Sequence, residues 1–195
     1  MKLKYTAILS AATLIVAAAN ANAGVAFDLY AGATAGFGRQ IVHVDNADTL
    51  KGSARSFGAV AGIDIPFIRL EAEYDYLDAT LKHHSSETYD SGISIGMLNA
   101  YVKTPGLGVI MPYIGGGIGV VWNVDIQDMP LKYKESSKPV YQGMLGMTLN
   151  IPALPFKIDL EGRLLYTSKL IDIAAINTSA SATHYDARVK LRYIF

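Results

Sequence analysis

The segment that decides the fold is THYDARVKLRYIF, residues 183–195. From Tyr185 to Phe195 its odd-numbered residues are aromatic, aliphatic or small: Tyr185, Ala187, Val189, Leu191, Tyr193 and Phe195. Its even-numbered residues are mostly charged or titratable: His184, Asp186, Arg188, Lys190 and Arg192. A period of two is typical of a β-strand whose faces lie in different environments. The segment therefore predicts a strand with one apolar face and one densely charged face.

The same alternation continues upstream. In residues 156–166 the polar positions are Lys157, Asp159, Glu161 and Arg163, and in residues 68–76 they are Arg69, Glu71, Glu73 and Asp75. Extending the pattern predicts eight strands, at about 25–38, 55–65, 67–77, 92–103, 110–123, 139–150, 156–167 and 183–195. The expected connections alternate between long polar loops (39–54, 78–91, 124–138, 168–182) and short turns (Pro66, 104–109, 151–155). This arrangement predicts an all-β fold, an eight-stranded antiparallel up-and-down transmembrane β-barrel.

One predicted strand, 92–103, has an irregular pattern. Its apolar residues Ile93 and Ile95 appear out of phase with Ala100 and Val102. A β-bulge inserts one extra residue and so changes which face the following side chains occupy. We therefore expect a bulge near Gly96.

The positions of the aromatic residues indicate which face is outside. A soluble barrel such as a lipocalin would put the apolar face inside, whereas a membrane barrel puts it against lipid. Phe27 and Phe37 lie ten residues apart, as do Phe156 and Tyr166; ten residues of tilted strand span about 25 Å along the membrane normal, the height of an apolar band between two aromatic girdles. The predicted girdle residues are Phe27, Phe37, Phe57, Tyr74, Trp122, Tyr141, Phe156, Tyr166, Tyr185, Tyr193 and Phe195. This spacing favours the membrane barrel.

The first 23 residues have the features of an export signal. Lys2 and Lys4 precede an apolar stretch of about fifteen residues, which is short for a membrane-spanning helix. Ala21 and Ala23 supply the small-x-small pattern that signal peptidase requires. We expect residues 1–23 to be a cleaved signal peptide and residues 24–195 to be the barrel domain.

Composition excludes several other classes of protein. The chain has no cysteine, so disulfide scaffolds, Cys-ligated metal centres and cysteine nucleophiles are ruled out. Its 17 basic and 17 acidic residues balance, which argues against a nucleic-acid partner. We expect no cofactor and no metal site.

If the apolar face is outside, the charged face lines the lumen. The predicted lumen ion-pair network contains Arg69, Glu71, Glu73, Lys157, Asp159, Glu161, Arg163, Arg188, Lys190 and Arg192, and the same phase also places Asp28, Asp64, Asp75, Lys103 and Asp186 inside. The interior of an eight-stranded barrel is only wide enough for side chains to fill it, so charges of both signs must pair there. A structural network is the favoured interpretation; a narrow ion path or a pH gate is the alternative.

The glycines fit this narrow interior. Gly115, Gly117 and Gly119 alternate on the inner face of one predicted strand, and Gly32, Gly36 and Gly38 on that of another. No helix is predicted to follow them, so a dinucleotide-binding loop is not favoured. We expect larger inward side chains to pack against these glycines.

Catalysis has little support in the residues. His83 and His84 lie in a predicted loop next to Ser85 and Ser86, and His184 lies inward near Ser181 and Asp186. A catalytic triad needs a third, orienting group, and two histidines alone hold a metal ion poorly. The chain is therefore predicted not to be an enzyme.

In several segments the chain resembles the small outer-membrane barrels of the OmpA-like type, a group that includes porin-family and opacity-like proteins. These segments are AFDLYAGATAGFG (26–38), LNAYV (98–102), MPYIGGGIGVVW (111–122) and DARVKLRYIF (186–195). The resemblance implies that the barrel-assembly machinery recognises Phe195 as its assembly signal. It also implies a location in the outer membrane of a Gram-negative bacterium, with outer-membrane lipid and lipopolysaccharide around the barrel.

The predicted function is a structural or surface-interaction role, adhesin-like, through four extracellular loops that contact host or phage ligands. The alternatives are a narrow, porin-like ion channel and, less favoured, a lipid A-modifying enzyme. We expect a monomer.

Overall fold

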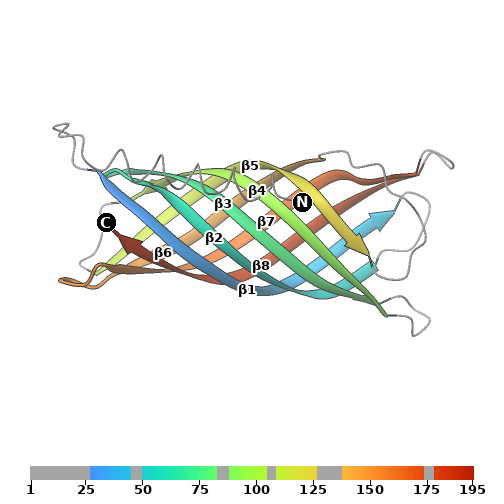
Figure 1. Ribbon diagram of the computed structural model, residues 1–195, viewed down its shortest axis with the longest axis horizontal. Helices are drawn as coiled ribbons and strands as arrows, with labels where there is room; N and C mark the ends of the chain where they lie inside the picture. The colour runs from blue at the N-terminus through green and yellow to red at the C-terminus, as the bar shows by residue number, and fades with distance from the viewer. Residues whose placement is uncertain (1–26, 45–49, 83–87, 105–108, 127–137, 174–177) are drawn as a thin grey trace, which may run out of the picture.

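The computed structural model of the chain is a closed β-barrel (Figure 1). It describes residues 27–44, 50–82, 88–104, 109–126, 138–173 and 178–195. The strands are β1 (Asp28–Val44), β2 (Leu50–Asp64), β3 (Ile68–Lys82), β4 (Thr88–Lys103), β5 (Ile110–Ile126), β6 (Lys138–Asn150), β7 (Phe156–Ile173) and β8 (Thr178–Ile194). The predicted fold class, eight antiparallel strands in sequence order, is confirmed.

Pairing between the first and last strands closes the barrel. The register of β1 and β8 runs from Tyr30 opposite Ile194 to Val44 opposite Ala180. All eight strands are tilted against the long axis of the barrel (Figure 1). Among the described residues there is no helix long and apolar enough to cross a membrane.

The two ends of the barrel differ in their connections. At the turn end, residues 65–67, 104–109 and 151–155 join the strands, as predicted. At the loop end the strands are longer than predicted, because β1 continues to Val44 and β2 already begins at Leu50. The predicted loops 39–54, 78–91, 124–138 and 168–182 are therefore too long. Exposed charged side chains such as Arg39, Lys51 and Asp78 make these strand ends resemble loops in composition.

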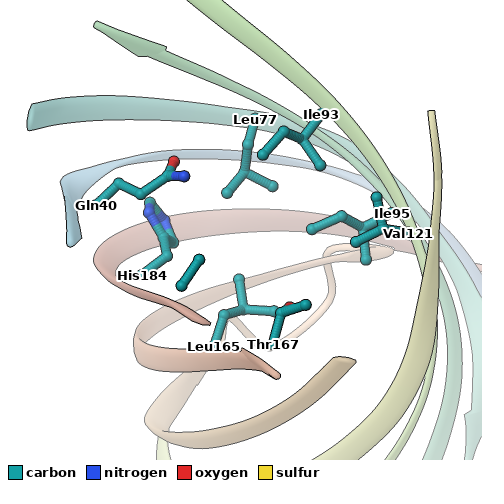
Figure 2. A pocket seen from close by; sticks show the side chains of 9 residues that line it. Gln40, Leu77, Ile93, Ile95, Val121, Leu165, Thr167 and His184 are labelled. Atoms are coloured by element: carbon teal, nitrogen blue, oxygen red, sulfur yellow. The ribbon is translucent and has the colours of Figure 1, made fainter. Parts of the chain in front are cut away.

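A bulge does occur close to Gly96, beside Ser94 and Ile95, but it is not on the predicted strand. The β3–β4 register is continuous from Ile68–Val102 to Lys82–Thr88, so β4 contains no extra residue. The irregularity lies in β5, where Ser94 faces Asn123 and Ile95 faces Val121, leaving Trp122 as the extra residue. Ile93 and Ile95 point inward in phase with Tyr101 (Figure 2). The sequence pattern indicated the wrong phase for this strand because the inner face of the barrel is apolar near the loop end.

The interior has two chemically distinct parts. Near the loop end lies the apolar cluster, which we define as Leu77, Ile93, Ile95, Met97, Val121, Val140 and Leu165. Nearer the turn end lies the ion-pair network, which we define as Asp64, Arg69, Glu71, Glu73, Asp75, Lys103, Lys157, Asp159, Glu161, Arg163, Asp186, Arg188, Lys190 and Arg192. On β7 the boundary falls between Arg163 and Leu165, which are consecutive inward residues.

The outer face carries an apolar belt. Its exposed residues include Leu98, Ile114, Ile118, Leu145, Leu164 and Val189. Among the outward side chains that the structure describes, the charged ones are Arg39, Lys51, Arg55 and Asp78. Each lies closer to the loop end than the outward aromatic residue of its own strand, Phe37, Phe57 or Tyr76. The belt is therefore free of charge on its described surface.

The inward glycines make room for large side chains, as predicted. A Cβ atom at Gly115 would collide with the ring of Tyr101, and one at Gly117 with the amide of Asn99. A Cβ at Gly36 would lie 2.9 Å from that of Arg188. The close approach of neighbouring side chains accounts for glycine at these positions, so no ligand is needed to explain them.

Candidate functional site in the barrel interior

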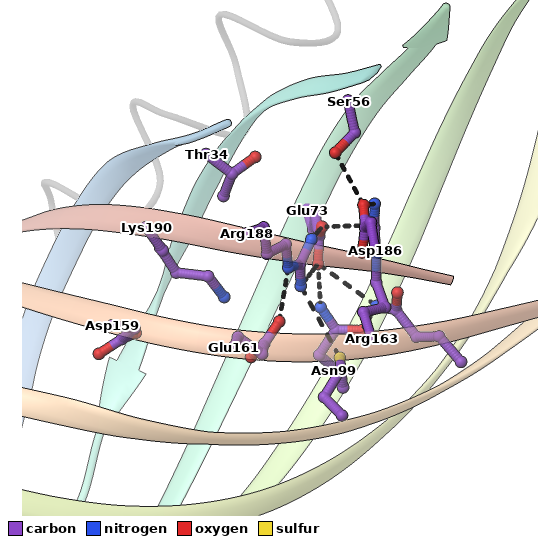
Figure 3. A network of polar contacts seen from close by, with 12 residues as sticks. Thr34, Ser56, Glu73, Asn99, Asp159, Glu161, Arg163, Asp186, Arg188 and Lys190 are labelled. Carbon is purple, nitrogen blue, oxygen red and sulfur yellow. Dashed lines mark hydrogen bonds and ion pairs between the residues drawn. The ribbon is translucent and has the colours of Figure 1, made fainter. Parts of the chain in front are cut away.

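Arg163 and Asp186 form a bidentate pair in the ion-pair network (Figure 3). These residues face each other across β7 and β8. Arg163 Nε and Nη2 donate to Asp186 Oδ1 and Oδ2 at 3.0 and 2.6 Å, a bidentate arrangement. Arg163 Nη1 also contacts Asp75 and lies 3.3 Å from Glu73 Oε1. One guanidinium group thus neutralises carboxylates from two different walls of the barrel.

Arg188 provides a second connection across the lumen. Its Nε donates to Glu161 Oε1 at 2.5 Å, and its Nη1 pairs with Glu73 on β3. In the strand order of the closed barrel, β3 and β8 are separated by β1 and β2. Asn99 and Gln142 donate to Glu73 Oε2 from two further strands, at 2.5 and 3.3 Å. The network therefore fills the cross-section at this level.

A third group of pairs lies nearer the turn end. Arg192 binds Asp159 in a bidentate arrangement, with Nε–Oδ2 and Nη2–Oδ1 distances of 2.8 and 2.9 Å. Arg69 Nη1 reaches the same carboxylate at 2.9 Å. Asp64 is shared by Lys103, Lys157 and Arg192. Between this group and Arg188, Lys190 Nζ lies 2.6 Å from Glu71 Oε1.

Three buried tyrosines also belong to the interior, and the sequence analysis missed their role. Tyr30 and Tyr101 donate to Glu71 at 2.7 and 2.8 Å, and Tyr113 donates to Glu161 at 2.9 Å. The predicted girdles had placed five other tyrosines, Tyr74, Tyr141, Tyr166, Tyr185 and Tyr193, at the membrane edges. The available signal was strand phase, because Tyr101 lies between Asn99 and Lys103 on the inward face.

Two of these rings also hold Arg69. Its guanidinium carbon lies 4.0 Å from the centroid of the Tyr101 ring and 4.5 Å from that of Tyr113. The two rings meet edge to face. Arg69 Nε and Nη2 make no hydrogen bond with a described residue. Attraction to the ring faces partly compensates these buried N–H groups.

The structure places all ten predicted lumen residues inside the barrel, with Lys157 partly exposed at its rim. Of the other residues predicted to be inward, Asp64, Asp75, Lys103 and Asp186 are buried. The prediction for Asp28 needs correction, because its side chain is 52% exposed and lies 3.3 Å from Lys157 Nζ. Asp28 is the first residue of β1, so it lies at the mouth of the barrel, where solvent reaches it.

The predicted aromatic residues lie mostly on the outer surface. Phe37, Phe57, Tyr74, Tyr141, Phe156, Tyr166, Tyr185, Tyr193 and Phe195 are exposed. At the turn end the rings of Phe156, Tyr193 and Phe195 stack edge to face, with centroids 5.2 and 5.3 Å apart. Phe27 is half-buried, whereas the side chain of Trp122 falls outside the described part of the structure. The backbone N–H of Phe195 donates to Leu29 at 2.9 Å.

Other predictions concern residues that the structure does not describe. The signal peptide with Ala21 and Ala23 lies outside the described residues, as do His83 and His84. His184 is buried in the lumen, with Nε2 3.2 Å from Asp186 Oδ2. Within the described ranges, no three His, Asp or Glu side chains are grouped to hold a metal ion.

Comparison with known proteins places this architecture among solved membrane barrels. No protein-family model and no curated protein matches the sequence. Neisserial surface protein A is similar in structure at 16% sequence identity, with 83% of this chain and 95% of that chain covered and a TM-score of 0.53. The attachment invasion locus protein Ail of Yersinia pestis is 12% identical, with 85% and 99% covered and a TM-score of 0.49. OprG from Pseudomonas aeruginosa is 12% identical, with 86% and 95% covered and a TM-score of 0.48.

The conclusion from these comparisons rests on the first of the three, whose TM-score exceeds 0.5. At this level of identity the likeness concerns the path of the chain and not the ligands of the relatives. The sequence resemblance to OmpA-like barrels is thus confirmed at the level of the fold: this chain has the fold of the eight-stranded outer-membrane β-barrels.

Proposed function

We propose that the chain is an integral outer-membrane protein of a Gram-negative bacterium whose barrel carries four surface loops with a structural or adhesin-like role. The observation that supports this most directly is the inverted distribution of polarity. Arg163, Arg188 and Glu73 are buried inside, whereas Leu98, Ile114 and Leu145 are exposed outside. Such an inversion suits a barrel surrounded by lipid.

The energetics favour lipid as the surroundings of the belt. Monomeric soluble proteins rarely expose continuous apolar patches larger than a few hundred Å², and this belt extends over neighbouring strands around the barrel. Pairing of β1 with β8 also provides hydrogen-bond partners for the backbone N–H and C=O groups of both terminal strands. Lipid requires this, because no water is available there for unpaired N–H and C=O groups.

The first residue of β1, Asp28, and the last of β8, Ile194, both lie at the turn end of the barrel, and the proposed orientation puts this end in the periplasm. The connections at 45–49, 83–87, 127–137 and 174–177 would then lie outside the cell. Charged side chains on the outer face are concentrated toward that end, at Arg39, Lys51, Arg55 and Asp78. These groups suit contact with lipopolysaccharide headgroups, and the loops suit contact with host or phage ligands.

The proposal includes export by a cleaved signal peptide and insertion by the barrel-assembly machinery, with Phe195 and nearby aromatic residues as the recognised segment. It treats the protein as a monomer without enzymatic activity. Ring stacking between Tyr193 and Phe195 presents an exposed aromatic surface at the turn end, which supports this assignment.

Membrane fractionation and heat-dependent gel migration test the membrane assignment. The protein should fractionate with outer membranes, and the unboiled barrel should migrate differently from the boiled chain. Replacing Leu145 by Lys on the lipid-facing belt should reduce the folded fraction, because a Lys near the bilayer centre costs about 2–4 kcal/mol. Lys51→Leu, outside the belt, serves as the control. Recovery of a folded protein in the soluble periplasmic fraction would contradict the proposal.

Planar-bilayer recording tests whether the barrel has a structural interior or conducts ions. Ion pairs cross the lumen from β3 to both β7 and β8. We therefore expect no reproducible unitary conductance steps from the purified protein. Regular steps that persist at several voltages would instead favour the channel.

A further inference from the structure

Three basic side chains lie together on the outer face of the barrel near its loop end. Arg39 on β1 faces Ser53 on β2, and Lys51 and Arg55 are the outward residues on either side of Ser53. Diagonal neighbours of this kind are about 7–8 Å apart in an antiparallel sheet. Because arginine and lysine side chains are long, their charged ends can surround one group placed between them. We call Arg39, Lys51 and Arg55 the basic group.

The charges of the basic group have no counterpart within the described structure. All three side chains are exposed. The ion pairs among the described residues lie in the lumen or at its rim, and none includes a member of the basic group. Asp78 on β3 is the register partner of Arg55 but forms no ion pair with it. With three cations and one carboxylate, the described side chains of this surface carry a net charge of +2.

The basic group lies just beyond the aromatic residues of the outer face. Arg39 and Arg55 are each two positions from Phe37 and Phe57, toward the loop end. Two residues of a strand rise about 7 Å, and aromatic girdles lie at the level of the lipid headgroups. On the neighbouring β8, the outward residue at this level is the uncharged Thr183. The basic group therefore faces headgroups from one side of the barrel.

Below the aromatic residues, the outer face of β1 and β2 consists mainly of alanine. Ala31 faces Ala61 and Ala33 faces Ala59 across these strands, which lie side by side in Figure 1. We call these four residues the alanine wall. By contrast, four leucine and isoleucine side chains on β4, β5 and β6 are 62–68% exposed. Small residues alone would not select a ligand, but beneath a group of cations they form a flat surface for acyl chains.

We propose that the basic group binds the phosphate monoester of one lipid molecule in the surrounding leaflet, with the acyl chains along the alanine wall. A phosphate monoester carries about −1.5 to −2 charges at pH 7, which matches the net charge of the described side chains. Arg39 and Arg55 can each offer paired N–H groups to phosphate oxygens, and Lys51 adds a point charge. The inference rests on the proposed function, because it requires an outer membrane around the barrel.

The probe for this site is lipid A with its phosphate monoesters, and the matched compound is the same lipid A without phosphate. The folded barrel in micelles of a neutral detergent is titrated with each lipid, and native mass spectrometry counts the bound molecules. We expect one saturable molecule of the phosphorylated form and binding of the other form weaker by about tenfold. Equal binding of the two lipids would overturn the proposal.

Inorganic phosphate distinguishes a lipid site from a site for free anions. Added at the concentration of the phosphorylated lipid A, it should displace none of the bound lipid, because it makes no contact with the alanine wall. Displacement at equal concentration would mean that the acyl chains contribute nothing, and this result would overturn the lipid assignment.

Arg39→Gln combined with Arg55→Gln removes two cations of the basic group. Phosphorylated lipid A should bind this double variant about tenfold more weakly than it binds the unchanged protein. Asp78→Asn is the matched control, which removes a charge of opposite sign from the same surface and should not weaken binding. Undiminished binding to the double variant, or weaker binding to Asp78→Asn, would contradict recognition of phosphate by these cations.

Ala59→Leu and Ala100→Leu test the alanine wall. Both residues are outward and exposed, on β2 and β4 respectively. Only Ala59→Leu should weaken binding, and equal effects would contradict the placement of the acyl chains. Heat-dependent gel migration and membrane fractionation are measured for every variant. A barrel that fractionates with outer membranes but shows no preference for phosphorylated lipid A contradicts this inference alone, whereas a soluble periplasmic protein contradicts the proposed function.

Discussion

Arg163 and Leu165 are consecutive inward residues of β7, yet they belong to interiors of opposite chemistry. From Arg163 toward the turn end, guanidinium, ammonium and carboxylate groups interlock at distances down to 2.5 Å. From Leu165 toward the loop end, aliphatic side chains surround a pocket. An ion pair fixes the direction in which each charged side chain points and the partner that it contacts, whereas aliphatic side chains can pack in several arrangements. The difference indicates that the charged part fixes the shape of the barrel, whereas the apolar part can adjust its packing.

The largest loss of stability is expected from Arg163→Glu. The change would place a new carboxylate beside Glu73, Asp75 and Asp186 and remove the cation that joins them. Disrupting a buried pair costs about 3–5 kcal/mol, and repulsion adds to this. We expect the free energy of unfolding, measured with urea in lipid vesicles, to fall by at least that amount, or the barrel not to fold.

Arg55→Glu is the control for that reversal. Arg55 lies on the outer face near the loop end and is exposed. Its reversal should change stability by less than about 1 kcal/mol. Unchanged unfolding and gel migration in Arg163→Glu would contradict the structural role of the ion-pair network.

A smaller effect is expected when Leu165 is changed to Ala in the apolar cluster. Truncation of a buried leucine costs about 2–5 kcal/mol, and the cost is lowest where neighbouring groups can fill the space that is left. Because aliphatic neighbours can rearrange, we expect a loss near the lower limit in the same urea measurement. Leu164→Ala on the lipid face should cost less. A loss as large as that of Arg163→Glu would contradict the difference between the two interiors.

A methyl group added on the inner face tests how tightly the side chains beside the ion-pair network are packed. Gly117→Ala would push a Cβ against Asn99, which donates to Glu73, whereas at Gly116 the nearest atom would be 3.8 Å away. Overpacking costs about 1–3 kcal/mol. Only Gly117→Ala should lower the urea midpoint. Equal midpoints for the two variants would mean that the charged interior accommodates a methyl group as easily as the outer face does.

The smallest predicted effect comes from a single hydroxyl group. Tyr101→Phe removes the 2.8 Å hydrogen bond to Glu71 but keeps the ring beside Arg69. We expect a loss of about 1.5 kcal/mol, the low end for a hydrogen bond to a charged group, because Tyr30 and Lys190 still hold Glu71. Tyr141→Phe, on the exposed face, is the matched control and should be nearly neutral. If the two variants lost equal stability, the inward hydroxyl would contribute nothing specific.

Strand alternation allowed the fold and the charged half of the interior to be predicted. Polar and apolar or small residues alternate without interruption from residue 156 to 163 in β7 and from residue 185 to 193 in β8. A single phase therefore assigned Arg163, Arg188 and Arg192 correctly to the lumen. The rule failed where both faces were apolar. Ile93 and Ile95 are apolar like the residues that face lipid, so the sequence did not show that they point inward. This ambiguity led to the prediction of a bulge in β4 and left the apolar cluster unpredicted.

Partners within the network could not be predicted either. Phase indicates that Glu73 and Arg188 face inward, but their contact depends on which strands oppose each other and on how far each side chain reaches. The pocket beside Gln40 and His184 depends on the same three-dimensional information. At the loop end of the barrel, the charged residues Arg39 and Asp78 led to the prediction of loops where the structure has strands.

The pairing of β1 with β8 has a consequence for how the protein is made. Tyr30 and Ile194, which lie near opposite ends of the sequence, are neighbours in the sheet. Until the last strand arrives, the incomplete sheet has two free edges that can template pairing with other chains. Contacts so distant in sequence also form slowly. Completion of the ring is therefore the step at which the newly made chain most needs protection from aggregation.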